Sequence, residues 1–125
     1  MNDKARKWLR RAEEDLLALS QLIPAQTPDV VGMLCQQALE KRLKVCWLEL
    51  GLRVPLSHDL RTLWSEVSAS VQCDIDAERL REITPYGTRA RYSDFDIPLT
   101  DAVSSVIFTL ETGAKLKMWL EGQNT

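Results

Sequence analysis

Arginine and tyrosine side chains gather in one short stretch of this chain, residues 88–94, which reads TRARYSD. An arginine guanidinium presents a rigid fork of donors that matches a phosphate, and a tyrosine adds a ring face for stacking and a hydroxyl. The stretch lies in a segment, about residues 86–99, that shows neither helical nor strand periodicity. Loops beyond about 12–15 residues are uncommon in compact domains unless they have a function. We therefore expect Arg89, Arg91 and Tyr92 to bind a ligand, with Arg91 and Tyr92 as candidate catalytic residues.

The same loop also has a structural interpretation. Arg91 could pair with Asp94 or Asp59 and hold the loop against the protein, because a bidentate arginine suits a carboxylate as well as a phosphate. The region contains four arginines, at positions 79, 81, 89 and 91, and a single ion pair that holds the loop requires only one of them. This local density favours a ligand-binding role. Both interpretations remain open from the sequence.

His58 is the only histidine in the chain. Histidine is the side chain whose proton affinity suits acid–base work near neutral pH, so His58 is a candidate catalytic residue. It stands beside an expected helix cap, where it could instead contact a nucleotide or hydrogen-bond to loop backbone. A catalytic role requires that the fold bring it close to Arg91 or Tyr92.

A second basic group is formed by Lys41, Arg42 and Lys44 within a predicted helix. Gln37 and Lys41 share a face of that helix at i and i+4, and we take these two as candidate ligand-binding residues. A solvated helix face is the usual interpretation of such a charged run, and it applies equally to the lysines and arginines between residues 4 and 11.

No metal or other cofactor is expected. The carboxylates Glu13, Glu14, Asp15 and Glu40 do not have the spacing of a ligand set, and Cys73 has no cysteine or histidine near it in sequence.

The composition sets the class of protein. A chain of 125 residues with 45% hydrophobic and 27% charged residues fits one globular domain, here residues 1–125. Its net charge of −2 excludes a general polycation, so any anion binding must be local. It contains no apolar run of about 18 residues and no apolar segment behind its charged N-terminus, which argues against a membrane span and a signal peptide. With three thiols that the sequence does not pair, we expect a cytoplasmic protein.

Hydrophobic spacing predicts helices throughout, and no segment alternates with the period of a strand. The first helix ends before Pro24, the second runs from a Thr27 cap to about Leu50, and the third follows a Ser57 cap with Asp59 in its first turn. A short fourth helix begins near Asp74 or Asp76 and is broken by Pro85 and Gly87, and the last helix follows a Thr100 cap with Asp101 in its first turn. The predicted fold is all-α, an antiparallel bundle of four main helices plus a short one.

The second predicted helix is apolar around much of its circumference. Such a helix contacts neighbours on more than one side, either as the central helix of a bundle or as part of a dimer face. We expect a homodimer from this surplus of apolar surface. The four tryptophans lie on or beside apolar stripes, which favours core or interface positions for them.

Four motifs in order resemble those of the HEPN domain family of small prokaryotic helical proteins. Trp8, Ala12, Asp15 and Leu16 resemble its opening helix, and residues 36–44 (QQALEKRLK) resemble its second helix. Residues 57–60 (SHDL) resemble the start of its third helix, and residues 90–94 (ARYSD) resemble the segment before its last helix.

This resemblance implies a helical bundle that commonly dimerises, with a site near the dimer seam. It also implies a partner, because many members stand beside an MNT-type nucleotidyltransferase in a toxin–antitoxin pair. Many members are metal-independent ribonucleases with an arginine followed, four to six residues later, by a histidine, whereas others are thought only to bind nucleotides. Here no histidine follows Arg89 or Arg91. Arg53 and His58 have the spacing of this signature, but they lie between the second and third predicted helices.

The leading hypothesis is therefore a HEPN-fold partner of a nucleotidyltransferase that binds RNA or nucleotide. The alternatives are an active metal-independent ribonuclease, with Arg91 and a substituted acid or base such as His58, and a helical adaptor without chemistry.

Overall fold

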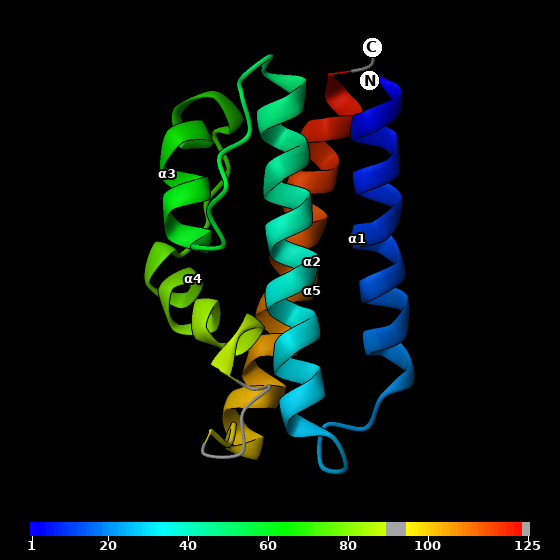
Figure 1. Cartoon of the computed structure of the whole chain (residues 1–125), viewed down its shortest axis with the longest axis vertical. Coiled ribbons are helices and arrows are strands. Elements are labelled where there is room, and N and C mark those ends of the chain that lie inside the picture. Colours follow the sequence, from blue (N-terminus) through cyan, green and yellow to red (C-terminus); the bar gives the residue numbers. More distant parts are fainter. Residues whose placement is uncertain (90–94, 124–125) are drawn as a thin grey trace.

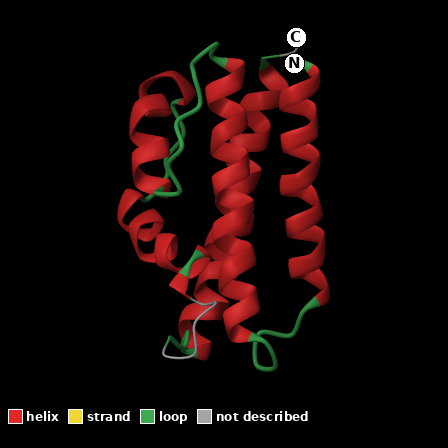
Figure 2. Cartoon of the chain, viewed as in Figure 1, coloured by secondary structure: helices red, strands yellow, loops and turns green. Residues whose placement is uncertain are grey.

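Helices make up most of the protein in this computed structural model, which describes residues 1–89 and 95–123; within these ranges there is no strand (Figure 2). The elements in chain order are α1 (Asp3–Gln21), α2 (Pro28–Glu49), α3 (Leu60–Val71), α4 (Ala77–Ile83), the 3₁₀ turn η1 (Thr84–Gly87) and α5 (Leu99–Gly122). The predicted all-α bundle of four main helices and a short one is thus confirmed. None of the described helices combines the length and apolar character needed to cross a membrane.

Helix α2 is the central helix, with α1 on one side and α3 and α4 on the other (Figure 1). It contacts α1, α3, α5 and η1, and its buried residues all lie between residues 31 and 46. Its wide apolar surface is therefore covered within the chain itself. Leucine is the commonest side chain of the core that surrounds it, and the largest fully buried side chains include Leu39, Leu43, Leu60, Leu63, Leu80, Ile83, Leu116 and Leu120.

Two hydrogen bonds define how α5 runs along α2. Near the starts of both helices the Ile97 amide donates to Asp29 Oδ1 (2.8 Å), and farther along both helices Arg42 Nη1 donates to the Gly113 carbonyl (2.7 Å). Helices α2 and α5 are therefore parallel, whereas α1 and α2 are antiparallel (Figure 1). The predicted antiparallel packing is thus correct for α1 and α2 and wrong for α2 and α5. The parallel pair is possible because the chain between the two helices returns to the end at which α2 begins, through the connections before and after α3 and through α4 and η1 (Figure 1).

Two predicted helix starts need correction. Helix α3 is capped by Asp59, whose carboxylate accepts from the Thr62 amide (3.0 Å), while the predicted cap Ser57 accepts from the Asp59 amide (3.1 Å). Helix α5 follows Pro98, so Thr100 lies inside the helix rather than capping it. At α3 the cap position is taken by Asp59, whose backbone is extended, and at α5 it is taken by Pro98 without a side-chain cap hydrogen bond.

The segment predicted to be a long loop is partly helical. Thr84–Gly87 forms the 3₁₀ turn, and Tyr86 is buried with its ring centroid 6.2 Å from that of Phe95. Ile97 is also buried. Both ends of the predicted loop are thus fixed against the bundle, and residues 90–94 lie outside the described part of the chain.

Candidate functional site

Three polar side chains, Gln36, Glu40 and Lys44, form a row along α2. They are spaced at i, i+4 and i+8, so they lie on one face of the helix. Their exposed fractions are only 1%, 5% and 6%. Buried polar groups need hydrogen-bond partners, so this row must be satisfied by its surroundings.

Glu40 is the centre of the resulting network. Its Oε1 accepts from Gln36 Nε2 and from His58 Nδ1, both at 2.9 Å, and its Oε2 accepts from Lys44 Nζ at 3.2 Å. Burial alone would raise the pKa of the Glu40 carboxyl. The hydrogen bonds from Gln36 and His58, together with the charge and hydrogen bond of Lys44, outweigh burial and hold that pKa below its ordinary value. Glu40 is therefore a carboxylate at neutral pH.

The ionised Glu40 determines the tautomer of His58. A carboxylate can only accept hydrogen bonds, so His58 Nδ1 must carry the proton that lies between them. In the neutral ring Nε2 is then an acceptor, as a general base requires. The His58 side chain is 68% exposed and sits in the α2–α3 connection, so this ring is accessible from solvent.

Two glutamines hold the histidine loop against α2. Gln36 Nε2 donates to the His58 carbonyl (3.1 Å) as well as to Glu40, and Gln37 Nε2 donates to Gln36 Oε1 (2.8 Å). Gly87 packs closely on this pair, since a Cβ added there would lie 2.1 Å from Gln36 Oε1. The absence of a side chain at Gly87 therefore lets η1 approach α2.

A small pocket opens where these elements meet. Gln36, Gln37, Glu40, His58, Gly87 and Thr88 line it, and its volume is about 220 Å³. That is below the roughly 300–1,000 Å³ typical of pockets that enclose a whole small ligand, so it suits one base or one sugar–phosphate unit. Arg89, which follows directly in sequence, is exposed. Among the described residues no three His, Cys, Asp or Glu side chains come together to hold a metal ion.

The sequence-predicted site residues separate into three groups. Gln37 and His58 line the pocket, and Arg89 follows a residue that lines it. Lys41 instead points toward α1, where its Nζ lies 2.6 Å from Asp15 Oδ2. The remaining candidates, Arg91 and Tyr92, lie outside the described residues, so their distance to His58 is not defined.

Sequence reasoning missed the residues that organise the pocket. The interpretation of Arg42 and Lys44 as a solvated face is wrong, because both are buried. Lys44 is paired with Glu40, and its Nζ lies over the Trp8 ring, 5.6 Å from the ring centroid. The i, i+4, i+8 spacing of Gln36, Glu40 and Lys44, which places three polar side chains on one face of α2, was the signal available in the sequence. The lysines and arginines between residues 4 and 11 are exposed, as predicted.

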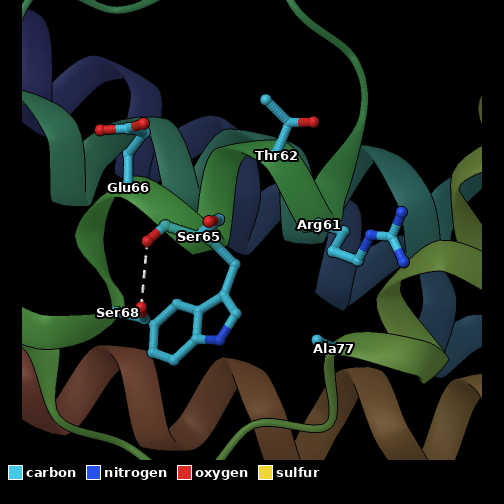
Figure 3. Close-up of a pocket in the computed structure, with 7 residues that line it drawn as sticks. Arg61, Thr62, Ser65, Glu66, Ser68 and Ala77 are labelled. Carbon is cyan, nitrogen blue, oxygen red and sulfur yellow. Dashed lines mark hydrogen bonds between the residues drawn. The ribbon is translucent and has the colours of Figure 1, made fainter.

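A larger hollow lies beside α3, with a volume of about 470 Å³, and Figure 3 shows the residues that line it. Six of its seven lining residues belong to α3, and only Ala77 comes from another helix. Ser68 Oγ is engaged with the Ser65 carbonyl (3.0 Å). Arg61 and Glu66 supply one charge of each sign, and no histidine lines the hollow. The pocket at His58 is the candidate site, because it combines a histidine held by a carboxylate with residues from α2, the α2–α3 connection and η1.

Comparison with known proteins gives one match. The family model of the HEPN domain matches residues 5–115, which is nearly the whole chain. No curated protein and no solved structure matches the chain.

Proposed function

This chain belongs to the HEPN domain family, and from that premise we propose that it binds RNA or a nucleotide at the pocket lined by His58, Gln37 and Thr88. We further propose that it acts with an MNT-type nucleotidyltransferase in a toxin–antitoxin or defence pair. The observation that carries the binding proposal is the exposed His58 ring, held by a buried carboxylate at the edge of a polar pocket.

The chemistry of the pocket suits a nucleotide unit. Arg89 beside the pocket supplies a guanidinium for a phosphate, and the Gln37 side chain offers both an amide donor and an acceptor for a base edge. Glu40 does not repel such a ligand strongly, because Gln36, His58 and Lys44 all donate to it. Arg91 and Tyr92 follow a few residues later and remain expected contacts.

Binding is tested by fluorescence anisotropy with a labelled single-stranded RNA. Arg89→Ala is expected to weaken binding about tenfold, the loss of roughly 1.5 kcal/mol that one charge-assisted phosphate contact provides. Arg10→Ala is the matched control, since it removes the same charge from an exposed position on α1. Equal losses in both variants would refute a local site and indicate only general charge attraction.

The pairing is tested separately by co-expression. If the gene beside this one encodes a small nucleotidyltransferase, the two proteins should copurify as a complex. Two proteins that are expressed together and elute apart at micromolar concentrations would contradict the pairing.

The His58–Glu40 contact favours a second candidate function, metal-independent ribonuclease activity. In this reaction His58 Nε2 takes the proton of a ribose 2′-hydroxyl, the 2′-oxygen attacks the adjacent phosphorus, and the 5′-oxygen leaves with a proton from water. The products are a 2′,3′-cyclic phosphate and a 5′-hydroxyl. The family's arginine–histidine signature is incomplete here, so His58 would replace its histidine from a different position in the chain.

Cleavage assays separate the two functions. An active enzyme should cleave RNA in the presence of EDTA, fail on the 2′-deoxy version of the same sequence, and lose activity in His58→Ala. Binding without cleavage would leave the nucleotide-binding function and exclude the nuclease. A protein that shows no RNA binding and no RNA cleavage would favour the helical adaptor.

A further inference from the structure

Arg42 is a buried charge that lacks a direct counter-ion. It is only 3% exposed, and its Nη1 donates to a neutral acceptor, the Gly113 carbonyl (2.7 Å). Within residues 1–89 and 95–123 its Nε has no hydrogen-bond partner, and no carboxylate forms an ion pair with its guanidinium. An arginine cannot avoid the cost of burial by losing its proton. A buried charge that is so incompletely paired therefore calls for a further partner.

The charges around Arg42 compensate its burial only in part. Burial lowers the pKa of the Arg42 guanidinium, and the carboxylates Glu13 and Glu121 oppose that change from a distance without cancelling it. Glu121 lies closer to Lys117, whose Nζ is 3.9 Å from Glu121 Oε1. The surroundings of the guanidinium can therefore accept one more negative charge.

An open groove between α1 and α5 leads to this guanidinium, and its volume is about 330 Å³. The residues that line it are Glu13 and Leu16 of α1, Arg42 of α2, and Leu110, Ala114 and Lys117 of α5. Since α2 is the central helix, Arg42 contributes to the floor of the groove, and residues of α1 and α5 form its walls. The groove is distinct from the pocket at His58, because Arg42 and Glu40 are about 200° apart around α2.

We propose that the α1–α5 groove binds a small aliphatic carboxylate, with the carboxylate against Arg42 and the aliphatic chain along the apolar walls. A carboxylate has two acceptor oxygens that match the edge of a guanidinium formed by Nε and Nη2. Gly113 occupies Nη1, on the other side of the guanidinium, and Nε is the nitrogen without a partner.

The walls and the size of the groove favour an aliphatic ligand of modest length. Leu16, Leu110 and Ala114 offer apolar surface beside the buried charge. The volume lies at the lower end of the roughly 300–1,000 Å³ found for pockets that enclose small molecules. The proposal does not depend on what the pocket at His58 binds.

Two exposed charges of opposite sign, Glu13 and Lys117, also line the groove. Glu13 repels an entering anion from the α1 side, whereas Lys117 attracts it from the α5 side. Removal of the two charges should therefore change carboxylate affinity in opposite directions. General attraction of anions to the protein surface would not select these two residues over other exposed charges.

Titration of ¹⁵N-labelled protein with octanoate tests the proposal, with NMR detection of the Arg42 Nε–H resonance. Octanoate should shift this resonance to saturation and bind about tenfold more tightly than acetate, which lacks the chain, and than 1-octanol, which lacks the charge. No shift with octanoate, or equal affinities for octanoate and 1-octanol, would overturn the proposal.

Substitutions test the same site by isothermal titration with octanoate. Arg42→Met keeps the apolar stem of the side chain and should weaken binding about tenfold. Arg11→Met is the matched control, because Arg11 is exposed and lies about 200° around α1 from Glu13, and it should keep the wild-type affinity. Glu13→Gln should strengthen binding about threefold and Lys117→Met should weaken it about threefold, as expected for exposed charges.

Circular dichroism of each variant establishes that its helix content is unchanged. If Arg42→Met does not fold, the opposite effects of Glu13→Gln and Lys117→Met decide the matter, since both residues are exposed. A folded Arg42→Met protein with wild-type affinity for octanoate, or equal effects of Glu13→Gln and Lys117→Met, would overturn the proposal.

Discussion

Replacing Glu40 with glutamine tests whether the buried network at the pocket is organised by charge. The change keeps the size of the side chain and one oxygen acceptor, but it removes the negative charge that faces Lys44 and His58. It therefore alters the electrostatics of the site with little change in packing.

The expected loss of stability follows from the buried charge that the substitution leaves without a partner. The Lys44 side chain is 8% exposed, so in Glu40→Gln a buried ammonium loses its counter-ion. Breaking a buried pair in this way costs about 3–5 kcal/mol. The amide oxygen still accepts one hydrogen bond and the Trp8 ring still faces the ammonium, which reduces the expected loss to about 2–4 kcal/mol. For a domain of this size that corresponds to a fall in Tm of about 10 °C.

Urea denaturation at pH 7 measures this loss as a change in the free energy of unfolding. Glu14→Gln is the matched control, because Glu14 is 67% exposed and 3.9 Å from Arg10 in a surface pair that contributes only about 0.5 kcal/mol. Adding Lys44→Met to Glu40→Gln should recover part of the stability, since no buried charge is then unpaired. A Glu40→Gln protein as stable as Glu14→Gln would refute the reasoning.

The difference in unfolding free energy between the wild type and Glu40→Gln should depend on pH in a definite direction. Because the pKa of Glu40 in the folded protein lies below its ordinary value of 4.5, its contribution to stability is fully present above that pH. The contribution is lost as the pH falls through the lower folded pKa. The gap in unfolding free energy between wild type and Glu40→Gln should therefore narrow below pH 4.5.

Three further predictions follow from the packing of the described residues. Gly87→Ala should destabilise the protein by about 1–3 kcal/mol in urea denaturation, because the new methyl group displaces the hydrogen-bonded Gln36 side chain; a neutral substitution would show that η1 can move away. Lys41→Met should lower stability by about 1 kcal/mol through loss of the pair with Asp15 and leave RNA binding unchanged, and a selective binding defect would restore Lys41 to the site. Iodoacetamide at pH 8 should label Cys73 before the other two thiols, whose pKa values burial raises to about 11 and 12, and mass spectrometry of the alkylated protein would reveal any other order.

Much of the fold could be predicted from the sequence, because helix formation here depends on local patterns. Five helices follow from apolar spacing and from breakers such as Pro24 and Gly51, whose positive φ of 71° suits a helix end. The caps at Ser57 and Thr100 were misplaced because several neighbouring residues can serve as caps, and the backbone chooses among them. The parallel course of α2 and α5 depends on contacts that are distant in sequence, which spacing alone does not reveal.

The candidate site was predictable only in part. His58, Gln37 and Arg89 were identified by residue type, and two of them line the pocket while the third follows it. As a site residue, Glu40 was weighed only as a metal ligand and set aside, since nothing local in the sequence connects it to a histidine 18 residues away. The homodimer expected from the apolar α2 stays a prediction, and its argument is weakened because α1, α3, α5 and η1 contact that helix within the chain.

The parallel packing of α2 and α5 also has a consequence for how the chain folds. Helices α1 and α2 are neighbours in sequence, so their pairing closes only a short connection and can form early. The Arg42–Gly113 contact joins residues 71 positions apart, and closing so long a loop costs more chain entropy than closing the turn between α1 and α2. Until α5 docks, the apolar side of α2 that it covers stays open to water. The α1–α2 hairpin is therefore the natural nucleus, and docking of the last helix completes the domain.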